Sequence, residues 1–110
     1  MARTPQNLAM SALSSTLLTE IYPSPIGFNT RVSSLIITNT TANALTVDVY
    51  RNNGTSDFLV RTLAIPAGIG RNVVYYGLQT VVINAGGNIS LKPSTTDTIN
   101  YFLDGTVIEL

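Results

Sequence analysis

The chain has 110 residues, which is enough for one domain with one hydrophobic core but not for two. Six basic and six acidic residues give a formal net charge of zero, and the basic residues do not cluster, so the composition argues against binding to nucleic acid or to an anionic membrane. The chain has no Cys and no His, which excludes disulfides, thiol catalysis and thiolate metal sites.

The low charge also bears on association. Charged residues make up 11% of the chain, whereas an average soluble protein has about 25%. Copies with so little charge repel one another weakly, and a free monomer usually carries more charge than this. The composition therefore favours a protein that works in an assembly, although an ordinary β-domain of low charge would have a similar composition.

Residues 1–15 differ in pattern from the rest of the chain, and we interpret them as an N-terminal arm. The arm places Leu8, Met10 and Leu13 among small and polar residues. This mixture fits an extended segment, a short helix or a frayed terminus. It has no continuous apolar stretch of the length found in signal peptides, so we expect the chain to be made and kept in a cytoplasm unless it is released by other means.

Residues 16–110 show short β-type runs separated by turn sequences at intervals of roughly ten residues, a pattern typical of sandwiches and barrels. We predict an all-β domain: a single antiparallel β-sandwich of about eight strands, jelly-roll or immunoglobulin-like, with no internal helix. The predicted strands are Leu17–Tyr22, Thr30–Asn39, Ala44–Arg51, Phe58–Leu63, Arg71–Tyr76, Gln79–Ile83 and Ile89–Lys92. Ile99–Leu103 and Thr106–Leu110 form one last strand or a pair of strands.

The segment Ser33–Tyr50 carries two β-rich runs joined by the polar connector Thr38–Asn43, which predicts a hairpin in the sandwich core. The first run contains the consecutive apolar residues Leu35, Ile36 and Ile37. Because consecutive apolar residues point to opposite faces of a strand, both faces should be covered here. This indicates a central strand or contact with another subunit.

The second run, Ala44–Arg51, alternates between apolar and polar residues, so one face should be core and the other wet or interfacial. The core face holds Leu45, Val47 and Val49. The other face holds Thr46, Asp48 and Tyr50, with Asp48 as a possible partner of an arginine on another strand or subunit.

Two turn sequences stand out among the loops. Asn52-Asn53-Gly54 is the strongest hairpin signal, because Asn and Gly tolerate the positive φ angles of tight turns, and the residues after it predict a longer loop than the two-residue minimum. Asp104-Gly105 separates the last two apolar runs and predicts either a bulge or a tight hairpin turn.

No catalytic constellation is present. The acidic residues do not recur at a motif spacing, and without His or Cys only Lys92 could activate a hydroxyl nucleophile. The glycine-rich turns do not match a phosphate or dinucleotide loop, and no segment has the oxygen ligands of a calcium loop. We therefore expect no enzyme activity, no cofactor and no metal site. Five tyrosines could form a sugar-stacking platform if several shared one face, so glycan binding is possible but unsupported.

Ser33–Tyr50, followed by the turns Ile65-Pro66-Ala67-Gly68 and Ala85-Gly86-Gly87-Asn88-Ile89, resembles a group of small virion proteins of tailed bacteriophages. In those proteins a strand, an Asn-rich turn and an alternating strand precede a Pro-Ala-Gly turn and a late Ala-Gly-Asp-type turn. Here Gly87-Asn88 stands where Asp would often follow the glycine, so a charge-dependent role of that turn does not carry over.

The resemblance implies a β-sandwich that decorates capsids or forms part of a neck, tail or fibre, commonly as a trimer. The first hypothesis is a capsid decoration (cement) protein that binds and stabilises the phage shell, with copies of itself and the major capsid protein as partners. It would reside in the virion and be assembled in the host cytoplasm. The alternatives are a receptor- or glycan-binding module of a neck or tail fibre and a non-viral sugar-binding sandwich.

Two groups of residues are candidates for the interfaces of such a protein. The arm could lie across an adjacent subunit and bury its apolar side chains, and the polar face of the alternating strand could contact a partner. The arm group is Leu8, Met10, Leu13 and Leu17. The strand group is Thr46, Asp48 and Tyr50.

Overall fold

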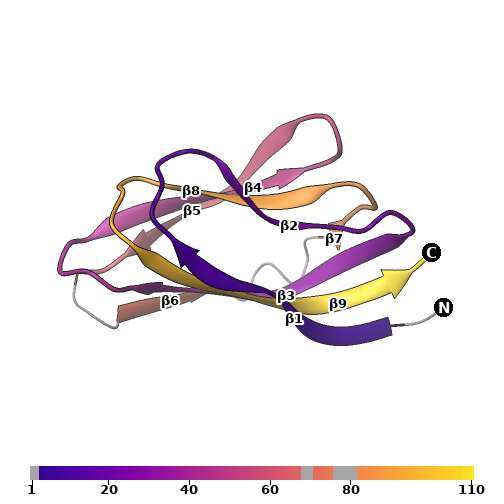
Figure 1. The fold of residues 1–110 in the computed structure, drawn as a ribbon, viewed down its shortest axis with the longest axis horizontal. Helices are drawn as coiled ribbons and strands as arrows, with labels where there is room; N and C mark the ends of the chain where they lie inside the picture. The colour runs from indigo at the N-terminus through magenta and orange to yellow at the C-terminus, as the bar shows by residue number, and fades with distance from the viewer. Residues whose placement is uncertain (1–2, 68–70, 76–81) are drawn as a thin grey trace.

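The computed structural model describes residues 3–67, 71–75 and 82–110, and these residues are β-strands and loops without a helix (Figure 1). All strand pairs are antiparallel. The strands are β1 (Arg3–Leu13), β2 (Thr19–Pro23), β3 (Phe28–Asn39), β4 (Leu45–Asn52), β5 (Asp57–Ile65), β6 (Arg71–Tyr75), β7 (Val82–Ile83), β8 (Asn88–Pro93) and β9 (Ile99–Glu109). In the described residues there is no helical segment of the length and hydropathy needed to cross a membrane.

The strands form two sheets that pack face to face as the two layers of a sandwich (Figure 1). The first sheet has the order β1-β9-β3-β6, with β7 also paired to β3, and the second has the order β2-β8-β4-β5. Both β6 and β7 lie along the edge of β3 that β9 does not occupy, each beside a different part of it. The predicted antiparallel sandwich of about eight strands is confirmed.

The pairing of the strands is nested. β1 pairs with β9, β2 with β8, β3 with β6 and β7, and β4 with β5. Consecutive strands from β1 to β4 alternate between the two sheets, so the chain winds around the core as one long double ribbon. This is a jelly-roll arrangement, and it decides between the two sandwich topologies that the sequence left open.

The prediction of a hairpin over Ser33–Tyr50 is wrong, because β3 and β4 lie in different sheets and do not pair with each other. The connector crosses from one layer to the other and is held by the buried side chain of Asn39. Its Nδ2 donates to the carbonyl oxygens of Asn43 (2.6 Å) and Pro66 (3.1 Å), and its Oδ1 accepts the backbone N–H of Thr41 (2.8 Å). Alternation showed which side chains face the core, but a core between two sheets receives them from either layer.

The hairpin predicted at Asn52-Asn53-Gly54 is confirmed and lies at the apex of the double ribbon. Asn52 pairs with Asp57, which leaves a loop longer than the two-residue minimum. Asn53 Oδ1 accepts the backbone N–H groups of Thr55 (3.1 Å) and Ser56 (3.0 Å), and Gly54 has a φ of 105°. The asparagine side chain therefore holds the loop, while glycine supplies the left-handed backbone.

The N-terminal segment is a strand, so the helical interpretation of the arm is wrong. Arg3–Leu13 forms β1, which pairs with β9 along its length and is the edge strand of the first sheet. The extended alternative is what the structure shows, within the chain's own sheet. An isolated segment of this composition has no strong preference, and pairing with the C-terminal strand supplies the hydrogen bonds that decide its conformation.

Asp104-Gly105 is neither a hairpin turn nor a bulge, because Ile99–Glu109 is one continuous strand. The register shifts lie on its neighbours, where Leu8 of β1 and Ser33 of β3 are the additional residues. A methyl group on Gly105 would overlap the carbonyl oxygen of Arg31 and lie 2.9 Å from Leu8 Cδ1. The glycine is needed because both neighbouring strands approach the backbone of β9 at this point.

The core lies between the sheets and is built from aliphatic side chains of both layers. Its fully buried members include Val32, Leu35, Ile37, Val47, Val49, Ile65, Ile83, Ile89, Leu91, Ile99 and Leu103. At one end, the buried Thr30 hydroxyl is hydrogen-bonded to Tyr22 Oη (3.2 Å) and Ser24 Oγ (2.9 Å). Every buried side-chain polar atom in the described residues has a hydrogen-bond partner, as the low dielectric of a core requires.

Gly105→Ala should destabilise the protein by about 1–3 kcal/mol, because the added methyl group overpacks the site between β1 and β3. At an open position with ordinary φ, Gly→Ala would instead stabilise the protein by roughly 0.4–1 kcal/mol, because it lowers the conformational entropy of the unfolded chain. The sign of the stability change therefore distinguishes a crowded position from an open one. Urea unfolding measures the difference. Thr106→Ala, at the next position of β9, is the control, and equal stability of Gly105→Ala and wild type would contradict the close approach.

Asn39→Ala should cost about 2–3 kcal/mol, because it leaves two carbonyl oxygens and one N–H of the inter-sheet connector without their partner. Thermal unfolding followed by circular dichroism reports the loss. Asn43→Ala retains the backbone carbonyl that Asn39 binds and should stay within about 0.5 kcal/mol of wild type. Similar losses in the two variants would show that the Asn39 side chain does not hold the connector.

Candidate interaction surfaces

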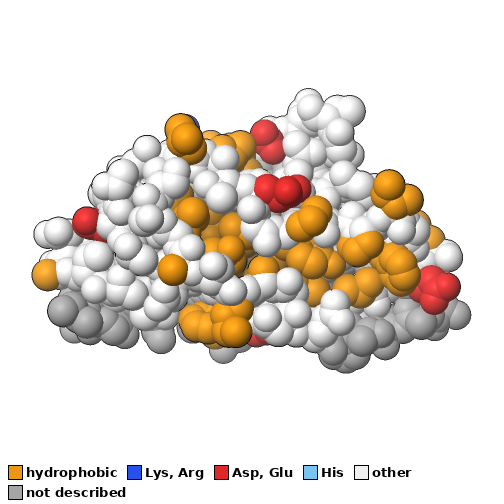
Figure 2. Space-filling view, in the orientation of Figure 1, with side chains coloured by type: hydrophobic (Ala, Val, Ile, Leu, Met, Phe, Trp, Pro, Cys, Tyr) orange, Lys and Arg blue, Asp and Glu red, His pale blue; other side chains and the backbone are white. Residues whose placement is uncertain are grey.

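The described part of the chain contains no detected pocket and no group of three or more His, Cys, Asp or Glu side chains that could hold a metal ion. Its surface does expose several large apolar side chains, on β1, in the loops around β2, on the edge strand β5 and at the C-terminus (Figure 2). They are Met10, Leu17, Leu18, Ile26, Phe58, Leu59 and Leu110. These side chains, with the outer faces of the two sheets, are the candidate interaction surfaces.

The four arm residues predicted to form one interface are divided by the structure. Leu8 and Leu13 are half-buried and pack against the chain's own core. Met10 is 64% exposed on β1, and Leu17 is 73% exposed in the loop that follows. Because the bulge at Leu8 turns both Leu8 and Ala9 towards the core, Met10 comes to lie on the opposite face. Only Met10 and Leu17 remain available to a neighbour.

The alternation predicted for β4 is present. Val47 and Val49 are buried, whereas Thr46 is exposed and Asp48 and Tyr50 are half-buried on the outer face of the second sheet. Thr46, Asp48 and Tyr50 therefore share the outer surface that the sequence placed them on. Their contact with another molecule stays a prediction.

The neighbours of Asp48 and Tyr50 on this outer face are mostly polar. Asp48 Oδ1 accepts a hydrogen bond from Thr62 Oγ1 of β5 (2.6 Å), and on its other side Asp48 is paired in register with Lys92 of β8. Tyr50 pairs in register with Leu59 of β5 and Ser90 of β8. The surface is hydroxyl-rich with one exposed apolar side chain beside the tyrosine.

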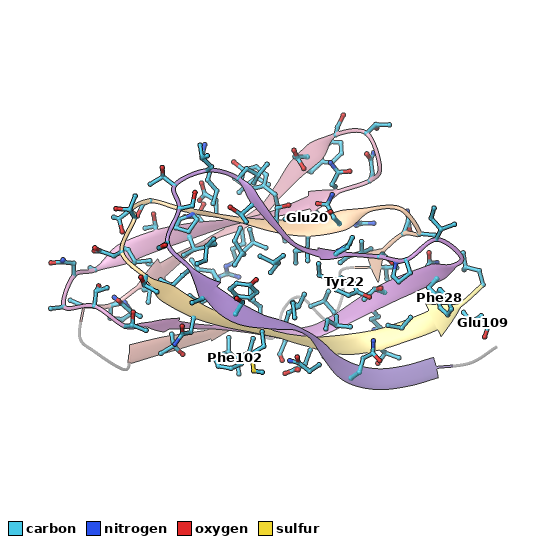
Figure 3. All side chains as sticks on the ribbon, in the orientation of Figure 1. Glu20, Tyr22, Phe28, Phe102 and Glu109 are labelled. Atoms are coloured by element: carbon cyan, nitrogen blue, oxygen red, sulfur yellow. The ribbon has the colours of Figure 1, made fainter. Side chains whose placement is uncertain are left out.

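The sequence did not predict an apolar row across the outer face of the first sheet. In register, Met10 of β1 is paired with Phe102 of β9, and Phe102 is paired with Ile36 of β3. Phe102 points away from the sandwich (Figure 3), on the side opposite its buried neighbours Tyr101 and Leu103. Phe102 and Ile36 are half-buried. We call Met10, Phe102 and Ile36 the apolar row.

A signal for this row was present in the sequence. Two β-runs, Leu35–Ile37 and Tyr101–Leu103, contain three consecutive apolar residues, which requires an apolar side chain on each face of the strand. In each run the first and third residues face the core, and the second residue, Ile36 or Phe102, faces away from it. Only the register of β9 with β1 and β3 shows that the two outward residues and Met10 are adjacent.

Of the five tyrosines proposed for a sugar platform, the three whose side chains the structure describes do not gather on one surface. Tyr22 and Tyr101 are buried in the core, and Tyr50 lies on the outer face of the second sheet. The side chain of Tyr75 and the whole of Tyr76 lie outside the described part of the structure, as do Gly68 and most of the strand predicted at Gln79–Ile83. The described tyrosines therefore provide no shared stacking face.

No protein-family model matches the chain. A search of curated proteins found no match either. Similar folds do occur among solved structures. The chain superposes on a protein of Bacillus endospore appendages, described as disulfide-linked pili, with a TM-score of 0.58 and 12% identity, covering 99% of this chain and 89% of the other. It superposes on the Drosophila NLP core, a structure described in terms of pentamer formation and histone binding, with a TM-score of 0.51 and 10% identity over 92% and 98% of the two chains.

A protein of the T13 viral particle of IBDV is also similar, with a TM-score of 0.48 and 12% identity. The match covers 97% of this chain, which spans only 31% of the viral protein. At these identities the superpositions on the Bacillus and Drosophila proteins show a shared fold.

Leu8→Ala should destabilise the monomer by about 1–3 kcal/mol, because Leu8 packs against the core and its removal leaves a gap over Gly105. Met10→Ala should change stability by less than about 0.5 kcal/mol, because the side chain is mostly in solvent. Unfolding of dilute protein in urea, where association is absent, compares the two. Equal effects would contradict the division of the arm residues between core and surface.

Proposed function

We propose that the chain is a structural virion protein, a jelly-roll subunit that decorates a bacteriophage shell as a cement protein and reinforces it. The observation that carries the proposal is the exposure of large apolar side chains on several outer surfaces of a chain with zero net charge. Contiguous apolar groups mark interaction sites more strongly than scattered ones do, and Met10, Phe102 and Ile36 lie on adjacent strands. The resemblance of its strand-and-turn pattern to small phage virion proteins supplies the class of assembly.

The physical properties fit a subunit that is surrounded by copies of itself and by the major capsid protein. Neutral, hydroxyl-rich faces pack against identical neighbours without like-charge repulsion. Burying a few hundred Å² of apolar surface at each contact contributes several kcal/mol at ~25 cal/mol per Å², before the cost of association. The proposed particle holds many copies in a virion assembled in the host cytoplasm, and the protein has no catalytic role. The resemblance to phage virion proteins implies that the copies form trimers on the shell.

Two proteins of similar fold support an assembly role in general terms. The Bacillus appendage protein belongs to pili, and the Drosophila protein is described as forming a pentamer. Both are subunits of ordered structures. This agrees with a jelly-roll chain that functions through its outer faces, and the phage shell is the specific form that we propose.

A second candidate is a neck- or tail-fibre module that binds a receptor or a glycan. The β4–β5 hairpin projects beyond the body of the sandwich (Figure 1), and its loop from Asn53 to Ser56 is exposed and polar. Phe58 and Leu59 are exposed at its base. Exposed polar loops beside aromatic anchors suit the recognition of a partner. The copy number separates the candidates, because a shell protein is present in hundreds of copies and a fibre protein in dozens or fewer.

Purified phage particles with and without this chain test the proposal. Particles that carry it should survive heating and low ionic strength at which particles lacking it release their DNA, and adding the purified protein should restore resistance. Quantitative gel densitometry of the particles gives the copy number in the same experiment. Equal survival of both particles, or absence of the chain from virions, would exclude the cement function.

A further inference from the structure

The outer face of the first sheet has the composition of an interface centre with a polar rim. The apolar row of Met10, Phe102 and Ile36 crosses three adjacent strands. On one side it is bordered by Asn100, paired in register with Ala12 and Thr38. On the other it is bordered by Asp104, paired with Asn7 and Ser34. An apolar centre within a polar rim is the usual anatomy of a protein–protein contact.

The polar border can be covered at low cost. Asn7 Nδ2 donates to Asp104 Oδ1 (3.0 Å), so the carboxylate already has a hydrogen-bond partner within the chain. Apart from Asp104, the described charged residues at outward register positions of this face are Arg31, which pairs with Thr106, and Arg3, which pairs with Ile108. One acidic and two basic groups give the face a net charge of about one, so two identical faces of this kind repel each other only weakly.

The area of the face matches what a stable pair of copies needs. Four strand positions at ~4.8 Å spacing and about eleven residues at ~3.4 Å rise give a face of roughly 700 Å². A standard interface buries about 800 Å² per partner. The length of β3 and β9, twelve and eleven residues, is therefore sufficient for one sheet to accept another of the same size.

We propose that this face binds the same face of a second copy, so that the protein forms a twofold pair through its first sheets. Face-to-face contact of identical surfaces is isologous and closes as a dimer. Sheets packed in this way lie ~10 Å apart and interdigitate their side chains, which places the apolar row of each copy against that of the other with Phe102 nearest the axis. The inference rests on the proposed function only in assuming that the chain works in an assembly.

Sedimentation velocity of the full chain over a concentration series tests the pairing. Phe102→Asp should raise the dimer dissociation constant at least ~30-fold, because it places a charge at the centre of the contact. Met10→Asp should also raise the dimer dissociation constant. The monomer should tolerate this substitution, because Met10 is largely exposed. Tyr50→Asp, the same type of change on the outer face of the second sheet, is the matched control and should leave pairing unchanged.

A mixing experiment tests the symmetry. Phe102→Asp and Phe102→Lys copies should each be monomeric alone and should form a heterodimer when mixed, because the proposed pairing places Phe102 near the twofold axis, where a residue meets its own copy. If the wild-type protein is monomeric at ~100 µM, the dimer dissociation constant lies above that concentration, and the inference is wrong. Pairing by Phe102→Asp at the wild-type concentration would overturn it as well.

Binding to purified shells, measured with the same variants, separates this inference from the proposed function. Variants that do not pair but still bind and stabilise shells support the pairing surface and leave the cement function intact. If wild type is monomeric and Phe102→Asp loses shell binding, the face belongs to the shell protein and the pairing inference is wrong. Failure of wild type to bind shells, with pairing intact, counts against the cement function alone.

Discussion

The C-terminal strand β9 (Ile99–Glu109) lies between β1 and β3 and hydrogen-bonds to both along its length, and the rest of the sandwich depends on this double pairing. It pairs with the first strand of the chain, and β1 and β9 form the outermost pair of the nested ribbon. Gly105 makes the arrangement possible, because its missing side chain allows both neighbours to bulge towards β9. The bulge on β1 in turn directs Leu8 inward and leaves Met10 outside. The close packing around Gly105 therefore accompanies the placement of Leu8 in the core and of Met10 on the surface.

The two outer faces of the molecule differ in chemical character. The second sheet presents hydroxyls and a carboxylate, with Asp48 and Thr62 hydrogen-bonded to each other beside Tyr50. The first sheet presents an apolar row through Phe102, bordered by the polar residues Asn100 and Asp104. A protein with two unlike faces can contact one kind of partner on each. This division fits a repeating structural subunit.

Neutral charge and exposed apolar groups have a single physical explanation in such a subunit. A free monomer with this surface would tend to self-associate, because charge repulsion is weak and burial of apolar area is favourable. In a lattice the same contacts are repeated, so modest energies at each interface stabilise the whole particle.

The sequence by itself determined the all-β class, most strand positions, the inward face of β4 and the turn at Asn53 and Gly54, because alternation and turn chemistry are local properties. Tertiary structure alone decided that β3 and β4 lie in different sheets, since both send side chains into the same core. It also decided the fate of the N-terminal segment, whose pairing partner lies at the far end of the chain. The apolar row also depends on the tertiary structure, because Met10, Phe102 and Ile36 are adjacent only through the register of three strands that are distant in sequence.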